Sequence, residues 1–209
     1  MAGKFAEIAF TPSVRARQEY QGSRSSYAAF DQIDSQQNDT LGPVEIQFIE
    51  ARDGFYQATV SETGWPYVQF RGGPPGFLKV LDERTIGYAD FRGNRQYISS
   101  GNLTVNDRVS LILMDYPNRR RLKIWATARQ IASQEDQLLV ERLRPTNYRA
   151  LPERLVLLTL EAFDWNCPSH IPARFTTEEL EPQLNGLRQR LHELEAENAD
   201  LRRRCANTD

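Results

Sequence analysis

The sequence predicts a mainly β fold, an antiparallel barrel with peripheral helices, followed by a C-terminal coiled-coil helix. Between residues 55 and 163, short stretches rich in β-branched and aromatic residues alternate with brief turn sequences, which is typical of β-hairpins. These stretches do not alternate with long helical segments, and neither GxGxxG nor GxxxxGK(S/T) occurs, which argues against a nucleotide-binding parallel sheet. From residue 180 onward, leucine recurs at steps of four and three, as a coiled coil requires.

Composition divides the chain into three parts. Residues 1–40 are polar and rich in turn-forming residues, and we expect an arm that packs on the barrel, with one short helix at 27–33. Disorder of this arm is the alternative. Residues 41–175 contain enough apolar residues for a barrel domain with its own core, and residues 176–209 are expected to form a parallel dimeric coiled coil.

The local pattern predicts each element of the barrel domain. Pro43 suits the first position of a helix, with Val44, Phe48 and Ala51 on one face. Stretches rich in β-branched and aromatic residues, bounded by turn sequences, then predict strands. The predicted strands are residues 55–60, 67–70, 77–81, 85–91, 109–115, 121–131 and 154–163.

Two further short helices are expected between these strands. One follows Arg92-Gly93-Asn94-Arg95 and ends near Leu103. The other is capped by residues 133–136 and runs to about Leu143.

Composition excludes several classes of function. The net charge of −2 provides no general attraction for nucleic acid or for an anionic membrane. No apolar run approaches the roughly 18 residues of a membrane span, and the first residues do not resemble a signal peptide. With 2 cysteines and 2 histidines, the chain offers neither a disulfide framework nor a multi-histidine metal site. We therefore expect a cytoplasmic protein without a bound metal.

Residues 64–103 contain the densest group of candidate binding residues. The Arg92–Arg95 run precedes a predicted helix, where cations and backbone N–H groups suit a phosphate. Ser99 and Ser100 add hydroxyl groups nearby. The residues on adjoining strands or at their ends are Gln69, Arg71 and Lys79, and the glycines that would let a flat ring approach are Gly72, Gly73 and Gly76. This combination suits flavin mononucleotide (FMN), although a solvated turn, an edge lysine and a rigid connector would explain the same residues.

The order of the elements and the segment 55–130 resemble the pyridoxamine 5'-phosphate oxidase-related FMN-binding split-barrel superfamily. The resemblance is closest to its bacterial branch of uncharacterised flavin-nucleotide-binding proteins, and it spans roughly residues 5–175. The runs that carry it are PYVQFRGGPPGFLKVLD, GYADFRGNRQYIS, NDRVSLILMDY and RRRLKIWATAR. It implies an antiparallel split β-barrel, an FMN cofactor, and a homodimer with FMN sites at the subunit interface.

The resemblance also implies a set of FMN-binding residues. Lys79 resembles the lysine that reaches the flavin, and Asn94-Arg95-Gln96 matches the family's phosphate-binding run. Because Gln96 stands where the family has a lysine, another cation is needed, and Arg71, Arg92 and Lys123 are the candidates. The full predicted set is Gln69, Arg71, Lys79, Val80, Tyr88, Ala89, Asp90, Asn94, Arg95, Gln96, Ser99 and Lys123.

The sequence departs from the oxidase at its C-terminal substrate motif. The family's Arg-Leu-His-Asp-Arg run is absent, and the nearest local feature is residues 165–174. Pyridoxamine phosphate is therefore not expected as the substrate. His170 and Arg174 remain candidates for closing over a flavin, or they are surface residues; Cys167 fits a packed thiol. The basic tip at residues 119–121 fits a solvated turn or a phosphate contact.

Three functions remain compatible with these residues. The first is an FMN-dependent oxidoreductase that passes hydride or electrons between FMN, NAD(P)H and an unidentified small molecule, with no catalytic side chain identified. The second is a non-catalytic flavin-binding sensor or scaffold, dimerised by its coiled coil. The third is a split-barrel protein that handles haem, with His170 as the one histidine near the barrel.

The C-terminal repeat has the features of a parallel two-stranded coiled coil. The repeating residues are Leu180, Leu184, Leu187, Leu191, Leu194, Asn198, Leu201 and Cys205. With Leu184 at heptad position a, Asn198 also falls at a, where a buried amide favours a dimer in register. Pro182 limits the seam to its C-terminal side or to the first helical turn. A helix packed on its own barrel is the alternative.

Overall fold

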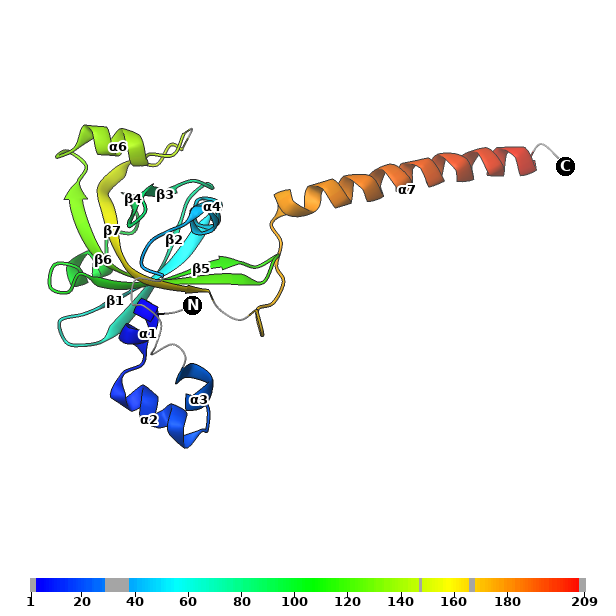
Figure 1. The fold of residues 1–209 in the computed structure, drawn as a ribbon. Helices are drawn as coiled ribbons and strands as arrows, with labels where there is room; N and C mark the ends of the chain where they lie inside the picture. Colours follow the sequence, from blue (N-terminus) through cyan, green and yellow to red (C-terminus); the bar gives the residue numbers. More distant parts are fainter. Residues whose placement is uncertain (1–2, 29–37, 147, 166–167, 207–209) are drawn as a thin grey trace. The chain divides into compact units, whose positions relative to one another are not determined.

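Seven antiparallel strands form one sheet in the order β2-β1-β5-β6-β7-β4-β3 (Figure 1). The computed structural model describes residues 3–28, 38–146, 148–165 and 168–206. The strands are β1 (Gly54–Val60), β2 (Pro66–Gly72), β3 (Leu78–Asp82), β4 (Thr85–Phe91), β5 (Arg108–Asp115), β6 (Arg120–Ala132) and β7 (Pro152–Trp165). All of the predicted strands are present, and each predicted end lies within two residues of the observed one.

The sheet curls until strands that are not neighbours face each other across its interior. Phe55 on β1 lies edge-on to Tyr88 on β4, with ring centroids 5.4 Å apart. The Tyr88 hydroxyl donates a 2.8 Å hydrogen bond to Oε1 of Gln57, also on β1. Since β2 and β3 end the strand order of the described residues, the curled sheet is open between them. The predicted antiparallel split β-barrel is therefore confirmed.

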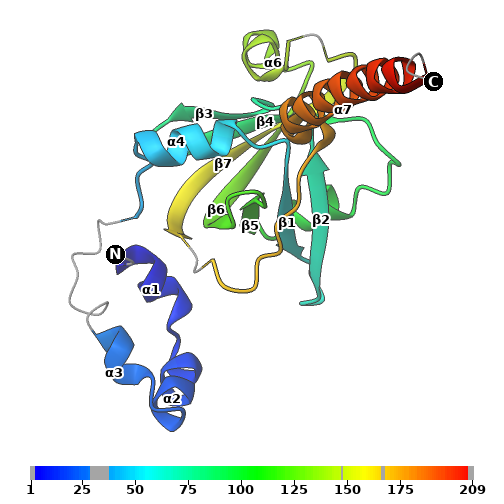
Figure 2. The same ribbon diagram turned by 90° about the vertical axis from the view of Figure 1, so that its right-hand side faces the viewer.

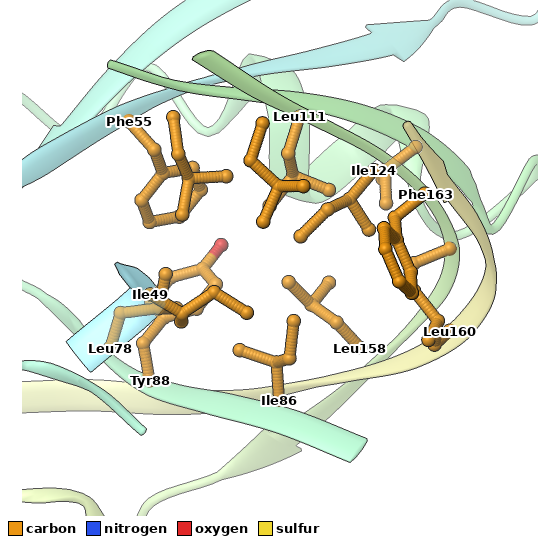
Figure 3. Packing of buried hydrophobic residues seen from close by; sticks show 14 of the residues in the cluster. Ile49, Phe55, Leu78, Ile86, Tyr88, Leu111, Ile124, Leu158, Leu160 and Phe163 are labelled. Carbon is orange, nitrogen blue, oxygen red and sulfur yellow. The ribbon is translucent and has the colours of Figure 1, made fainter. Parts of the chain in front are cut away.

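Alternating side chains fill the interior of the barrel (Figure 3). On β5, the buried positions Val109, Leu111 and Leu113 alternate with more exposed neighbours, as expected for a strand with one face toward a core. The largest side chains in this cluster are aromatic and branched aliphatic, and they come from β1, β4, β6 and β7 as well as β5. This packing holds the inner faces of distant strands together.

Helix α4 (Pro43–Glu50) lies against β3, as Figure 2 shows. The side chain of Glu45 accepts a 3.1 Å hydrogen bond from the backbone N–H of Gly42, which caps the helix at Pro43. The predicted helix is confirmed, but its predicted apolar face is partly wrong. Phe48 and Ile49 are buried, whereas Val44 is 57% exposed although it lies one turn before Phe48 on the same face, and Ala51 is exposed as well.

Two short helices follow within the barrel domain. Helix α5 (Ile98–Asn102) contacts β1, and α6 (Gln137–Leu143) lies against β4 and β7. The carboxylate of Asp136 caps α6 by accepting a 2.9 Å hydrogen bond from Leu139 N–H. The C-terminal Leu143 of α6 is fully buried. Both helices were predicted, and the caps explain where α6 begins.

The N-terminal segment contains helices α1 (Gly3–Ala9), α2 (Pro12–Tyr20) and α3 (Arg24–Tyr27). Only a helix at 27–33 was predicted; the described helical residues end at Tyr27, and residues 29–37 lie outside the described part of the chain. Helix α2 has no buried residue, so it lacks the apolar periodicity that would have predicted it. On α1, Phe5 stacks on Trp125 of β6 with centroids 4.6 Å apart.

The chain separates into two units, residues 1–115 with 119–169 and residues 116–118 with 170–209. The second unit consists mainly of α7 (Thr177–Ala206), which confirms the long C-terminal helix. Thr176 and Glu179 cap α7 reciprocally: Glu179 accepts from Thr176 N–H at 2.8 Å, and Thr176 accepts from Glu179 N–H at 3.2 Å. Among the described residues, no helix is both long and apolar enough to cross a membrane.

Candidate functional site

A polar cavity of about 240 Å³ lies where β2, β4 and β7 meet the segment that leads into α5. Gln69 and Arg71 of β2 are paired with Gln57 and Phe55 of β1, so all four side chains are on the inner face of the sheet. The residues that line the cavity are Tyr67, Gln69, Arg71, Asp90, Phe91, Gly93, Asn94, Arg95, Gln96, Tyr97, Ile98, Ser99, Ser100, Glu153 and Arg154.

Three strands contribute to a cluster of charged side chains in this cavity. Arg71 of β2 donates a very short hydrogen bond to one carboxylate oxygen of Asp90 on β4. The other Asp90 oxygen lies 3.3 Å from Nη1 of Arg154 on β7, and Arg154 also contacts Glu153 at 2.9 Å. The side chains of Asp90, Arg71 and Arg154 are 8%, 15% and 16% exposed, so these charges are largely shielded from water. Two guanidinium groups are thereby held beside one buried carboxylate.

Burial affects the charge state of this cluster. Removal from water raises the pKa of Asp90 above its ordinary value, and the two guanidinium groups oppose this increase. The buried Nε of Arg71 has no hydrogen-bond acceptor within the described residues. A buried donor without a partner is energetically costly. Arg71, whose side chain lines the cavity, therefore carries one donor that the described residues leave unsatisfied.

The segment before α5 contributes a second group of polar contacts. The Tyr97 hydroxyl donates to Oε1 of Glu153 at 2.8 Å, and the Ser99 hydroxyl donates to Oε1 of Gln69 at 2.9 Å. These bonds join the segment to β7 and to β2. Arg95 and Tyr97 both have left-handed backbone conformations, with φ of 63° and 54°. Such conformations are uncommon for residues other than glycine and occur often at functional sites.

Arg95 does not stand directly at a helix terminus. We expected the Arg92–Arg95 run to begin the helix, but α5 starts at Ile98 with Tyr97 as its N-cap residue. Asn94 instead accepts a 3.2 Å hydrogen bond from Gln96 N–H, which forms a local turn. Arg95 is exposed, and its Nε donates to the Tyr97 hydroxyl at 3.3 Å.

A second cavity of about 230 Å³ adjoins the first and shares Arg71, Asp90, Phe91 and Gly93 with it. Its other lining residues are Phe70, Gly72, Phe77, Tyr88, Ala89, Arg92 and Tyr148, and because several of its lining residues are aromatic we call it the aromatic cavity. Burial strongly raises the pKa of Tyr88, which keeps its phenol neutral. The polar cavity and the aromatic cavity are therefore neighbours that share part of their lining.

Two of the glycines that were expected to let a flat ring approach, Gly72 and Gly73, instead pack against the chain's own phenylalanine rings. A Cβ on Gly72 would lie 2.8 Å from the ring of Phe70, and a Cβ on Gly73 would lie 2.6 Å from Phe77. The space beside these two glycines is therefore filled by phenylalanine rings. Gly76 has φ of +82° with open space around it, so its conformation in the turn accounts for the glycine.

The structure brings together most, but not all, of the predicted site residues. Those lining the polar cavity are Gln69, Arg71, Asp90, Asn94, Arg95, Gln96 and Ser99, and those lining only the aromatic cavity are Tyr88 and Ala89. Lys79 and Val80 lie on β3 and line neither cavity; Val80 packs against the core. Lys123 forms a 2.9 Å ion pair with Asp164 and lies 4.6 Å above the ring of Phe5. Because its neighbours in β6 point inward, Lys123 is on the outer face.

Sequence reasoning missed Tyr97, Glu153 and Arg154. Arg154 reaches the site only because β4 pairs with β7, which places it directly opposite Asp90 in the register. Nothing near Arg154 in the sequence marks it as a binding residue, since the partner strand is far away along the chain. Tyr97 directly follows the Asn94-Arg95-Gln96 run, and its left-handed conformation is not visible in the sequence.

The remaining candidates belong to other segments of the chain. Cys167 is outside the described residues, and His170 and Arg174 belong to the second unit, where the Arg174 guanidinium lies 5.1 Å above the ring of Tyr116. At the basic tip, Arg120 packs against the rings of Phe48 and Trp165 at 5.2 and 4.6 Å. Among the described histidine, cysteine and acidic residues, no group of three could hold a metal ion.

Comparison with known proteins gives one match at the level of a family. The profile of a family described as "Pyridoxamine 5'-phosphate oxidase" matches residues 46–164, which is more than half of the chain. No curated protein matches the sequence.

Solved structures with a similar fold have little sequence identity to the chain. HupZ from Group A Streptococcus is 14% identical, with 64% of this chain and 99% of HupZ covered and a TM-score of 0.46. An FMN-binding protein from Syntrophomonas wolfei is 10% identical, with 71% and 97% covered and a TM-score of 0.46. An FAD-binding protein from Mycobacterium smegmatis is 12% identical, with 61% and 95% covered and a TM-score of 0.41.

Proposed function

Because the chain belongs to the pyridoxamine 5'-phosphate oxidase family, we propose that it binds FMN in the two adjoining cavities and acts as an FMN-dependent oxidoreductase. The observation that carries the proposal is the pair of largely buried guanidinium groups in the wall of the polar cavity, Arg71 and Arg154, with Nε of Arg71 lacking a partner among the described residues. A guanidinium group with an unsatisfied N–H, next to the second guanidinium group of Arg154, suits an anionic ligand with several acceptor oxygens.

The polar cavity suits the phosphate and the ribityl chain. Arg71 and Arg154 provide guanidinium groups, and Arg95 provides an exposed cation at the rim. The forked geometry of guanidinium matches the oxygens of a phosphate group. Asp90 holds Arg71 and Arg154 in place before a ligand arrives, so little side-chain ordering is needed upon binding.

The aromatic cavity suits the flat ring system. Phe77 and Tyr88 offer apolar walls, and the shared Arg71 lies between this compartment and the polar one. Bound there, flavin would supply hydride and single-electron chemistry, while the side chains position it and tune its charge. Of the predicted residues, Lys79, Val80 and Lys123 do not line either cavity, so we assign them no contact with FMN.

We further propose a homodimer with FMN sites at the subunit interface. Each cavity by itself is smaller than the roughly 300–1,000 Å³ typical of pockets for drug-sized ligands, which favours completion of the site by a second copy. NAD(P)H and an unidentified small molecule are the proposed reaction partners.

The low number of cysteines favours a cytoplasmic location. Residues 1–40 are proposed to pack on the barrel as an arm, which the Phe5–Trp125 stack favours.

A non-catalytic flavin-binding sensor or scaffold is the second candidate. The long C-terminal helix favours it, because such a helix adds an association surface that redox chemistry does not need. Both candidates require flavin, and they differ only in whether bound flavin turns over.

The experiment is an absorption spectrum and an FMN titration of the purified full-length chain. We expect a yellow protein that binds about one FMN per chain, more tightly than riboflavin, because riboflavin lacks the phosphate. A colourless protein that does not take up FMN would overturn the proposal. If FMN binds, anaerobic addition of NADH or NADPH separates the two candidates: bleaching of the flavin band indicates the oxidoreductase, and an unchanged spectrum indicates the non-catalytic module.

A further inference from the structure

Helix α7 exposes a stripe of leucines that no described residue of its own unit covers. Leu184 is 37% exposed, Leu187 68%, Leu191 57%, Leu194 45% and Leu201 52%. Most leucine side chains in a folded protein are buried, so a row of exposed ones on one helix indicates a missing partner.

The spacing of the stripe identifies the kind of partner. Its residues follow steps of three and four and therefore form a narrow seam along the helix. A helix that packs on a globular core normally presents a wider apolar face. We propose that α7 forms a parallel, two-stranded coiled coil with α7 of a second copy of this chain, an association that does not depend on flavin binding.

Charged residues beside the seam favour one register. With Leu184 at position a, Arg190 is at g and lies opposite Glu195 of the second copy at e; Glu197 at g likewise lies opposite Arg202. If one helix slips by a heptad, Arg190 instead meets an arginine, either Arg188 or Arg202. Like charges at these positions repel each other, so the in-register pair is preferred.

Rearranging these charged side chains costs little free energy. In the single helix, Arg190 contacts Glu193 at 3.1 Å, and the two side chains are 64% and 50% exposed. An exposed ion pair of this kind contributes little to stability. Arg190 can therefore exchange this contact for one across the interface, and the charges select a partner without opposing the association.

Asn198 favours the parallel orientation. It occupies position a in the C-terminal half of the seam, so the two Asn198 amides of a parallel pair face each other and can form hydrogen bonds. In an antiparallel pair, Asn198 would face a leucine, and a buried amide would have no partner.

As a single helix, α7 is expected to be only marginally stable, so pairing with a second helix should decide whether it forms in full. The cap formed by Thr176 and Glu179 stabilises its first turn. Pro182 within the helix removes one backbone hydrogen bond, and Gly186 has low helix propensity. A seam of about three heptads is marginal in water without a partner, so we expect the seam to start at Leu184 and to form only in the associated chain.

The test uses the full-length chain and compares seam variants with a matched variant on the outer face. Leu187→Ala combined with Leu194→Ala should weaken self-association at least about tenfold in sedimentation equilibrium, since each buried leucine contributes several-fold to the association constant. Gln189→Ala at the outward position f should leave it unchanged. At chain concentrations at which the barrels still pair, neither change should alter FMN uptake, because α7 lines neither cavity, so failure of this proposal is distinguishable from failure of the proposed function.

Charge exchange and cross-linking test the geometry. Glu197→Arg should weaken association by repelling Arg202 of the second copy, and adding Arg202→Glu should restore it. In a chain with Cys167→Ser and Cys205→Ser, Leu194→Cys should form a disulfide dimer on oxidation, whereas Gln189→Cys should not. Unchanged association of the leucine variant, with a lower melting temperature of the barrel, would instead assign the stripe to packing on its own chain. Absence of charge rescue, a trimer, or cross-linking only at position 189 would also overturn the proposal.

Discussion

Replacing Arg71 with methionine should separate the role of its charge from that of its side-chain stem. Arg71→Met keeps much of the apolar stem but removes the bond to Asp90 and the unpartnered Nε. A hydrogen bond between charged groups contributes about 1.5–3 kcal/mol, and because Arg71 is only 15% exposed, little of this is lost to water. Asp90 keeps its contact with Arg154, so we expect the chain to fold with its free energy of unfolding lowered by roughly this amount at neutral pH.

The effect of Arg71→Met should depend on pH. Burial raises the pKa of Asp90 above its ordinary value of about 3.9, so the stability that its neutral form provides is lost as the pH rises through the folded pKa. Removing Arg71 raises this pKa further and increases the loss. The variant should therefore differ most from wild type at neutral pH and approach it in acid, where Asp90 is protonated. Urea denaturation at several pH values measures this difference.

FMN titration and a matched variant complete this test. We expect Arg71→Met to weaken FMN binding by about 10- to 150-fold, which corresponds to one charged contact with the phosphate. Lys123→Met breaks a comparable ion pair on the outer face, where both side chains are more than a fifth exposed, and should change stability by at most about 1 kcal/mol and FMN affinity not at all. Equal losses of FMN affinity in the two variants, or none with Arg71→Met, would refute the assignment of the polar cavity.

Three further outcomes follow from the same structure. Arg95→Ala should weaken FMN binding more than Arg119→Ala does, because Arg95 lines the polar cavity, whereas Arg119 lies in the turn between β5 and β6; equal dissociation constants in fluorescence titration would remove Arg95 from the site. Tyr88→Phe should lessen the loss of stability above pH 10. Burial raises the pKa of Tyr88, so the folded protein is destabilised once the phenol of the unfolded chain, with a pKa of about 10, ionises. Circular dichroism during alkaline titration measures this loss, and identical profiles for the two proteins would contradict the prediction. Leu143→Ala should lower the free energy of unfolding by about 2–5 kcal/mol, since Leu143 is completely buried against β4 and β7. A loss below about 1 kcal/mol in urea denaturation would show that the surrounding side chains close around the smaller alanine.

Local sequence patterns predicted the strands well because strand formation here depends on neighbouring residues. Turn sequences such as Asp82-Glu83-Arg84 and Pro117-Asn118 mark where hairpins reverse, and apolar residues alternate between them. The helices α1 and α2 were not predicted, because α2 buries nothing and α1 has only a short apolar contact with the barrel. An element without an amphipathic pattern gives no periodic signal.

The candidate site was predictable only where its residues are close together in the chain. Gln69, Arg71, Asp90 and Ser99 were found because one stretch of sequence carries them. Val44 is exposed although it shares a face with the buried Phe48, because periodicity shows which residues of a helix share a face but not how much of the helix length is covered.

The sequence by itself determined the hairpin order, the membership of the family and the leucine repeat of α7, because each of these depends on residues near one another in the chain. Only the tertiary structure decided which charges share a cavity. Pairing of β4 with β7 places Arg154 opposite Asp90, and curling of the sheet brings Arg71 to the same carboxylate. Strand pairing and barrel closure join residues that are distant in sequence. The Nε of Arg71 is buried without a partner among the described residues only because those strands surround it.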